Sequence, residues 1–441
     1  MLALICILSL SACSQSEAGP LAAPEYPEMA HYPNDEDYIA TNGDFDYDKW
    51  QAAISAYSKD LSAQKQYESA CTGLDSYFAK TAGELLSSNT GENIVYSPVN
   101  LYLALGMLAE ITDSNTRQQI FDLIGEGSIE DVRRKCTAVW NACYRDTGNT
   151  TSIPASSIWL KNGYPYREEV LQTLASEYYA SSYSGEMGSI EYSKQLQNWL
   201  NENTRGLLED AAKAIEFNEY TRIALATTLY FNARWDAEFN EVNNGKGLFS
   251  LLDTGGTAIE CDFMHQTDSR YYYWGEKFSA VKQSFKSGGG MWLILPDEGV
   301  PVNDLAANDE AINFILSDGD WENSKYLTVN LALPRFDISA TTDLSEPLKA
   351  LGVTDVFDDS CSDFSPLTDE TLILSKATHS ARVKIDEEGC EAAAFTVMMV
   401  DAAAAMPPDE EVDFILNRPF MFVITGDSGL PLFIGTVNKP E

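Results

Sequence analysis

The spacing of hydrophobic and polar positions changes partway along the chain. Between about residues 71 and 145, apolar side chains recur every three or four residues, as Leu101, Leu105 and Leu108 do, which predicts amphipathic helices. Beyond that point, alternating or β-branched stretches such as residues 328–333 predict strands. Because the helices precede the strands, the pattern favours an α+β fold over a repeated βαβ array.

A further helical pattern lies in front of this globular part. Four apolar residues recur at helical spacing and predict an accessory helix: Trp50, Ile54, Tyr57 and Leu61. Residues 14–43 are instead rich in Pro and acidic side chains, which predicts an extended tether too polar to fold. The expected division is a signal segment over residues 1–12, an acidic Pro-containing tether with the accessory helix over 13–70, and one folded domain over 71–441.

The most informative pattern lies near the C-terminus, between two acidic runs. Residues 392–400 contain no charge, no Gly and no Pro, and in an extended segment successive side chains alternate between two faces. One face carries small or apolar residues, namely Cys390, Ala392, Ala394, Thr396, Met398 and Val400. The other face carries Glu391, Ala393, Phe395, Val397, Met399 and Asp401, and both charges of the segment, Glu391 and Asp401, therefore lie on it. Because such a segment could enter a sheet without the cost of burying a charge, we interpret it as a loop able to become a strand.

Composition and charge narrow the classes of partner. The chain has 29 Lys and Arg against 67 Asp and Glu, a net charge of −38. Such a surface repels phosphate backbones and anionic lipid, so we expect no nucleic-acid partner and no polybasic membrane docking. Outside the signal segment and Cys13, the cysteines show neither a CxxC nor a zinc spacing, and we expect no metal and no cofactor.

The N-terminus predicts export. An apolar run from Leu2 to Leu10, followed by Ser11, Ala12 and Cys13, resembles the bacterial lipoprotein signal, in which the cysteine is lipidated. A plain cleaved signal peptide is the alternative. We therefore expect a chain attached by a lipid on Cys13 to the cell envelope or cell surface, whose only contact with a membrane is that lipid.

A series of short motifs from about residue 72 to 440 resembles the serpins, the serine protease inhibitor superfamily. The acidic, alanine-rich stretch over residues 387–405 resembles their hinge and reactive loop. The other motifs follow in the family's order: residues 93–98, 104–107, 115–116, 229–231, Trp235, Phe239, 295–296, 334–336, 351–353, 363–365, His379 and 417–420.

This resemblance implies the serpin fold, in which helices pack on three β-sheets and an exposed reactive loop can insert into the central sheet. The loop's hinge would comprise Glu387, Glu388, Gly389, Cys390, Glu391, Ala392, Ala393 and Ala394. The region where the central sheet must part, the shutter and breach, would hold Ser97, Asn100, Thr227, Trp235 and His379. Asn100 and Thr227 depart from the Ser and Asn usual in the family, although both supply hydrogen-bonding groups.

The resemblance also implies a suicide inhibitor of serine proteases that is not itself an enzyme. A protease would cleave the loop, and the loop would then insert as a strand and trap the acyl-enzyme. The scissile bond would lie among Ala402, Ala403, Ala404, Ala405 and Met406. Such small residues suit elastase-like or subtilisin-like enzymes, with a cysteine protease as a further target class, and the absence of Lys and Arg excludes a trypsin-like preference. We expect a monomer.

The sequence leaves two other function classes. A non-inhibitory serpin that acts as a binding or structural protein is the alternative, but such members typically carry bulky or charged hinge residues where this chain has residues 392–394. A hydrolase is indicated only by residues 426–431, which resemble the serine loop of chymotrypsin-like proteases. A triad also needs a His and an Asp, and His31, His265 and His379 lack that context. Apolar strands flank residues 426–431, which predicts a hairpin turn.

Overall fold

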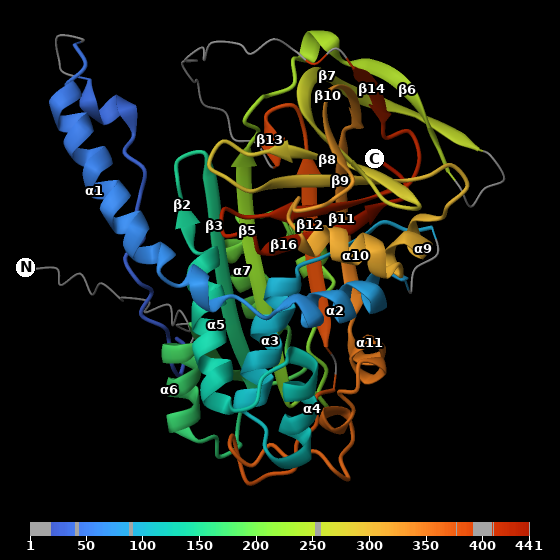
Figure 1. Ribbon diagram of the computed structural model, residues 1–441. Helices are drawn as coiled ribbons and strands as arrows, with labels where there is room; N and C mark the ends of the chain where they lie inside the picture. The colour runs from blue at the N-terminus through green and yellow to red at the C-terminus, as the bar shows by residue number, and fades with distance from the viewer. Residues whose placement is uncertain are drawn as a thin grey trace, which may run out of the picture.

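The computed structural model describes residues 19–39, 44–87, 91–251, 257–375, 377–390, 408 and 410–440. Figure 1 shows most of the helices around the lower half of the molecule, α1 apart from them at the upper left, and strands running through the centre and across the top. The α+β prediction is confirmed, because most of the long helices lie in the first half of the chain and most of the strands follow.

The described helices, in chain order, are η1 (Asp35–Tyr38), α1 (Tyr47–Lys65), η2 (Glu68–Ala70), α2 (Asp75–Ser87), α3 (Pro98–Glu110), α4 (Ser114–Ile124), α5 (Ile129–Cys143), α6 (Glu168–Glu177), α7 (Ile190–Asn203), α8 (Glu209–Lys213), η3 (Glu241–Asn243), α9 (Val302–Ala306), α10 (Asp309–Leu316), α11 (Ser345–Ala350) and η5 (Asp355–Phe357). The accessory helix predicted from helical spacing corresponds in position to α1.

Seven described strands form the central sheet, in the order β11-β12-β13-β5-β3-β2, with β4 also paired to β3. Among the described pairs of this sheet, β3–β4 alone is parallel. The strands are β2 (Arg145–Asp146), β3 (Thr150–Lys161), β4 (Ala180–Gly185), β5 (Ile223–Arg234), β11 (Phe336–Asp343), β12 (Thr378–Ile385) and β13 (Gly389–Cys390).

Nine further described strands form a second network, in the order β1-β16-β15-β9-β8-β7-β10-β14, with β6 paired to β7. They are β1 (Ile94–Tyr96), β6 (Gly245–Ser250), β7 (Ala258–Trp274), β8 (Phe278–Ser284), β9 (Gly290–Pro296), β10 (Ser324–Pro334), β14 (Glu411–Ile415), β15 (Phe420–Thr425) and β16 (Pro431–Val437). The expected three sheets therefore occur as two hydrogen-bonded networks. The 17-residue strand β7 pairs with β6 over its first six residues, with β10 from Phe263 to Tyr273 and with β8 over its last three residues, so it joins two of the expected sheets.

Helix α3 lies in the middle of the core. Ser97 caps its N-terminus by accepting a hydrogen bond from Asn100 N at 3.3 Å, and Pro98 occupies its first turn. Leu101 and Leu105 are buried, as the spacing predicted. Nearly all the rest of the helix is buried too, because α3 contacts both β5 and β16 and is enclosed between the two networks.

The N-terminal part of the described chain differs from the predicted tether. Residues 19–38, which we call the strap, lie along the surface of the domain. Ala22 pairs with Ser182 at the edge of β4, where Ser182 N donates to the Ala22 carbonyl at 2.8 Å. Tyr26 stacks on Trp140 of α5 with 5.4 Å between ring centroids. A few small and aromatic contacts thus order a segment whose overall composition is polar and Pro-rich.

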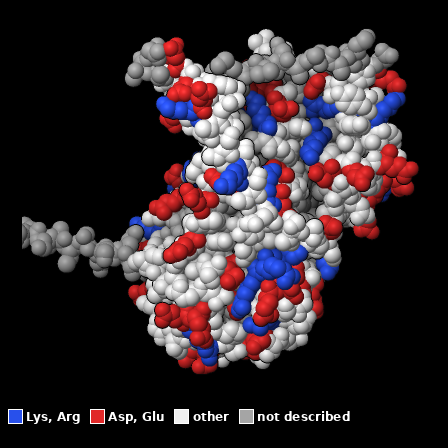
Figure 2. Space-filling view, turned by 60° about the vertical axis from the view of Figure 1, so that its left-hand side comes forward, with Lys and Arg blue, Asp and Glu red and all other residues white. Residues whose placement is uncertain are grey.

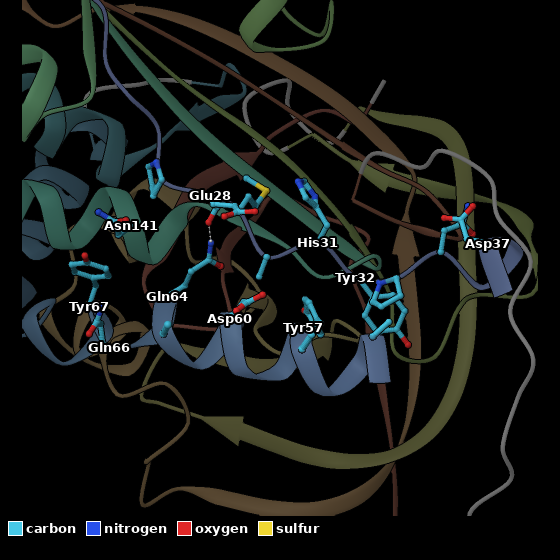
Figure 3. A pocket seen from close by; sticks show the side chains of 18 of the residues that line it. Glu28, His31, Tyr32, Asp37, Tyr57, Asp60, Gln64, Gln66, Tyr67 and Asn141 are labelled. Atoms are coloured by element: carbon cyan, nitrogen blue, oxygen red, sulfur yellow. Dashed lines mark hydrogen bonds between the residues drawn. The ribbon is translucent and has the colours of Figure 1, made fainter. Parts of the chain in front are cut away.

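A groove separates the strap from α1. Its volume is about 720 Å³, and Figure 3 shows side chains of both segments along it, among them His31, Tyr57 and Gln64. Helix α1 lies beside the domain and is not part of its core, since none of its residues is buried.

The hydrolase-like motif is a hairpin turn, as predicted. Residues 426–430 connect β15 to β16, which pair antiparallel. Gly429 has φ +77°, a left-handed conformation that glycine adopts without strain.

Candidate functional site

The start of the expected loop already occupies the central sheet. Strand β13 is two residues long and lies between β12 and β5, with Gly389 opposite Arg234, and Cys390 opposite both Ala233 and Ile385. Cys390 faces the core and is 3% exposed. A Cβ at Gly389 would collide with the carbonyl oxygen of Ala233, so this position accepts only glycine without movement of the strand.

A tight turn leads the chain from β12 into β13. Asp386 N donates to Gly389 O at 3.1 Å, and the Asp386 carboxylate accepts the backbone N–H of Glu388 at 3.1 Å. Trp235, which is fully buried, donates its indole N–H to the Asp386 carbonyl at 2.9 Å and its backbone N–H to the Glu388 carbonyl at 2.9 Å. The residue expected at the breach thus holds the hinge turn through two hydrogen bonds.

Glu387 is the buried charge of this hinge. It is 5% exposed and accepts hydrogen bonds from Arg335 Nε at 2.6 Å and from the Asn244 side chain. Its carbonyl also accepts Phe239 N at 3.0 Å. A buried carboxylate requires such partners, and the breaking of the pair would leave an uncompensated charge.

These partners of the hinge were not predicted from the sequence. Arg335 belongs to the motif at residues 334–336, but nothing in the sequence indicates that it pairs with a glutamate after β12. Arg234, whose guanidinium lies 3.5 Å from the Glu388 carboxylate, was not identified either. The sequence signal for both residues was their position: Arg335 lies within the motif at residues 334–336, and Arg234 directly precedes Trp235.

Beyond β13 the central sheet has a seam. In the described part of the chain no backbone ladder joins β12 directly to β5, and the two strands are connected only through β13 (Figure 1). Residues 224–227 of β5 are only partly buried along this seam. A cavity of about 110 Å³ adjoins the seam beneath α7 and α8, and its walls include Leu196, Phe217, Ala226, Thr378 and Ser380. The sheet can therefore accept a strand between β12 and β5.

Four of the predicted shutter residues, Ser97, Asn100, Thr227 and His379, meet where β5 and β12, the strands on either side of the seam, contact the start of α3. Ser97 N donates to His379 Nε2 at 2.9 Å, and Thr227 Oγ1 donates to the Asn100 carbonyl at 3.3 Å. The Asn100 side chain does not join this network, because its buried Oδ1 has no hydrogen-bond partner among the described residues. Burial lowers the pKa of His379 to about 4, so the ring is neutral at pH 7 and can accept the Ser97 hydrogen bond.

The remaining predicted site residues lie outside the described residues. They are Cys13, Glu391, Ala392, Ala393, Ala394, Ala402, Ala403, Ala404, Ala405 and Met406. Among the residues that are described, no group of three or more His, Cys, Asp or Glu side chains is arranged to hold a metal ion. Within the same residues, no helix is both long and apolar enough to cross a bilayer.

Comparison with known proteins places these features in context. A family model described as Serpin (serine protease inhibitor) matches residues 75–440. Serpin-Z2A of Triticum aestivum is 29% identical over 375 residues, which cover 80% of this chain and 92% of that protein. The solved structure of the thermophilic serpin Tengpin in its native state is 26% identical, with a TM-score of 0.74 over 83% of this chain and 94% of that one. Thyroxine-binding globulin in complex with thyroxine, 21% identical, superposes with a TM-score of 0.72 over 83% of this chain and 99% of its own and shares the fold.

Proposed function

The chain belongs to the serpin family, whose members are generally protease inhibitors, and we propose that it is a suicide inhibitor of serine proteases. A target protease attacks the loop that follows Cys390 and forms an acyl-enzyme with it. The severed loop then enters the seam as a new strand of the central sheet and carries the protease with it. Distortion of the bound protease prevents hydrolysis of the acyl-enzyme.

The seam headed by β13 is the observation that carries this proposal. Two residues of the loop are already paired between β12 and β5, and the strands below them are not paired with each other. Insertion therefore extends an existing strand and needs no new nucleus. Each added residue forms backbone hydrogen bonds that the seam lacks, and such bonds typically contribute about 0.5–1.5 kcal/mol each.

The register of β13 assigns a position to each inserted residue. Cys390 lies opposite Ala233 and Ile385 in antiparallel pairs, so each step along the loop is one step back along both neighbours. Ala392 then lies between Phe231 and Val383.

In the proposed inserted state the same register, four steps further along, puts Thr396 between Thr227 and His379, on the same side of the sheet as Cys390. Insertion would thus bring a hydroxyl to the shutter, where the buried Asn100 Oδ1 has no partner among the described residues. The small and hydroxyl side chains of this face therefore match the positions they would occupy in the core.

Inhibition then depends on a race between two rates. Insertion must be complete before water hydrolyses the acyl-enzyme, so the native form must be a metastable state whose loop stays out of the sheet. The hydrogen bonds of Trp235 and the Glu387–Arg335 pair fix the entry point of the loop. They hold the hinge in register without closing the seam below it.

The proposed targets are elastase-like or subtilisin-like serine proteases, with a cysteine protease as a further class. The support is the sequence of the loop, in which residues 402–405 are all alanine and residues 389–406 include no Lys or Arg. Shallow apolar specificity pockets accept such small side chains, whereas a trypsin-like pocket requires a cation.

A denaturing gel tests the proposed function. Mixed with elastase or subtilisin, the chain should give a 1:1 complex that survives boiling in detergent, and mixed with trypsin it should give none. If the chain is only cleaved by every such enzyme and leaves the protease fully active, the inhibitory function is excluded and the non-inhibitory binding protein becomes the better description.

We further propose that the mature chain begins at a lipidated Cys13 and acts at the bacterial cell envelope or surface. The support is the run Leu10-Ser11-Ala12-Cys13. Mass spectrometry of the protein from its native host should find a diacylglyceryl cysteine at position 13. An unmodified N-terminus elsewhere in the chain would rule out this anchor.

A further inference from the structure

Helix α1 stands apart from the core of the domain. None of its 19 residues is buried. It is held at its C-terminal end, where Lys65 Nζ lies 3.0 Å from Asp427, and along one side by the strap, where Gln64 Nε2 donates to the Glu28 carbonyl at 3.2 Å (Figure 3). Its N-terminal end projects beyond these attachments (Figure 1).

The projecting end carries a cluster of apolar side chains, which we call the tip: Ile39, Phe45, Tyr47 and Trp50. The rings of Phe45 and Tyr47 contact Trp50 at centroid distances of 6.1 and 5.7 Å, and Ile39 pairs with Phe45 through a β-bridge. Ile39, Phe45 and Tyr47 are 54, 44 and 56% exposed. An exposed cluster of this kind marks an interaction surface, and Trp and Tyr are enriched among residues that dominate binding.

Hydrogen bonds link the residues on either side of the tip. Asp46 N donates to the Tyr38 carbonyl at 2.7 Å, next to the bridge between Ile39 and Phe45. The Asp46 side chain caps α1 by accepting Lys49 N at 3.2 Å. These contacts hold Ile39, Phe45 and Tyr47 together in the chain by itself, which reduces the ordering that binding of a partner requires.

The position of the tip and its charge indicate the partner. In Figure 1 the tip end of α1 lies at the same pole as β13 and β14, the strands that the reactive loop connects. Asp44, Asp46 and Asp48 lie among the tip residues, with Lys49 as the neighbouring cation. Figure 2 shows acidic side chains at this end of the molecule. An anionic bilayer would be repelled, whereas a protein surface with an apolar centre and basic surroundings would be attracted.

We propose that the tip is a second docking surface for the target protease, in contact with the enzyme while its active site engages the reactive loop. This inference rests on the proposed function, because it takes the same protease as the partner. A second contact at the same pole raises the effective concentration of the protease at the loop. It accelerates association and leaves the later race between insertion and hydrolysis unchanged.

The test compares the parent chain with a double variant, Phe45→Ser with Tyr47→Ser. The matched control is Tyr220→Ser, which removes a 72% exposed tyrosine from the turn before β5, away from the tip. We expect the association rate constant with an elastase-like or subtilisin-like protease to fall about tenfold in the double variant and to stay unchanged in the control. The number of inhibitor molecules consumed per trapped protease should be equal in all three proteins. Equal melting temperatures would show that the double variant is folded.

The other outcomes separate this inference from the proposed function. If the parent traps protease and all three proteins associate at one rate, the docking surface is refuted and the inhibitory function stands. If the parent traps no protease, the proposed function fails. The docking surface is then tested by the affinities of the parent and the double variant for a protease whose catalytic serine is changed to alanine. Equal affinities of the parent and the double variant for this inactive protease would refute the docking surface. Loss of self-association in the double variant, or loss of binding to zwitterionic vesicles, would assign the tip to a second copy or to a membrane and overturn the proposal.

Discussion

Replacement of Ala392 by arginine tests the register of the inserted loop. Extended from β13, the register places residue 392 between Phe231 and Val383, which are 4% and 2% exposed on the core face of the sheet. Neither neighbour has an anionic or hydrogen-bond-accepting side chain to compensate a guanidinium. The matched variant is Ala393→Arg, because residue 393 faces the opposite side of the sheet by the alternation of side chains in a strand.

The size of the effect follows from the cost of an unpaired charge in the core, at least about 3 kcal/mol. If most of this cost is present in the transition state for insertion, insertion slows about 150-fold, since each 1.4 kcal/mol or so is a factor of about ten in rate. Hydrolysis of the acyl-enzyme is unaffected. An inhibitor that traps about nine encounters in ten would then trap only about one in twenty.

The assay measures trapped complex and cleaved inhibitor from the same reaction on a denaturing gel. Ala392→Arg should be cleaved at the parent's rate and give almost no complex, whereas Ala393→Arg should stay close to the parent. Equal losses in the two variants, or a loss in neither, would refute the register and the assignment of faces.

Three further predictions concern the native state. Lowering the pH from 7 to 5 should cost the parent about 2 kcal/mol of stability that a His379→Gln variant does not lose. The pKa of His379 is about 4 in the folded state and about 6.5 in the unfolded state, so between pH 7 and pH 5 only the unfolded state gains the proton. Equal pH dependence of the two proteins in urea titrations would contradict this. Arg335→Ala should lower the free energy of unfolding in urea by about 2 kcal/mol, a value reduced because Arg335 is partly exposed, and Arg335→Lys should recover part of it. An unchanged free energy of unfolding would refute the role of the Glu387 pair. Tyr26→Ala should make the strap cleavable by added protease in limited proteolysis, with loss of about 1 kcal/mol of stacking on Trp140; a strap as resistant as the parent's would show that other contacts hold it.

The sequence predicted the fold class and the order of the elements because these depend on periodicity and on the spacing of short motifs. The alternation around Cys390 was equally informative, since side chains of a strand alternate whatever the strand packs against. The structure places that residue on the core face, as the alternation implies for an inserted strand.

Other features depend on tertiary contacts that local patterns do not encode. The strap was expected to be an unpacked tether because its average composition is polar, but individual contacts such as Tyr26 on Trp140 decide its position. The pairing of Arg335 with Glu387 joins separate elements and leaves no local signal. Strand β7 merges two expected sheets because one long strand serves both, which alternation alone cannot show.

Hydrogen exchange of the seam is the measurement that tests the central claim most directly. The backbone amides of β5 and β12 that face each other across the seam should exchange readily in the native protein. After the loop is cut by a protease that is not trapped, and likewise in the trapped complex, these amides should become strongly protected, because the inserted strand now bonds to them. If cleavage leaves the exchange of these amides unchanged, the loop does not enter the seam, and inhibition by loop insertion is contradicted.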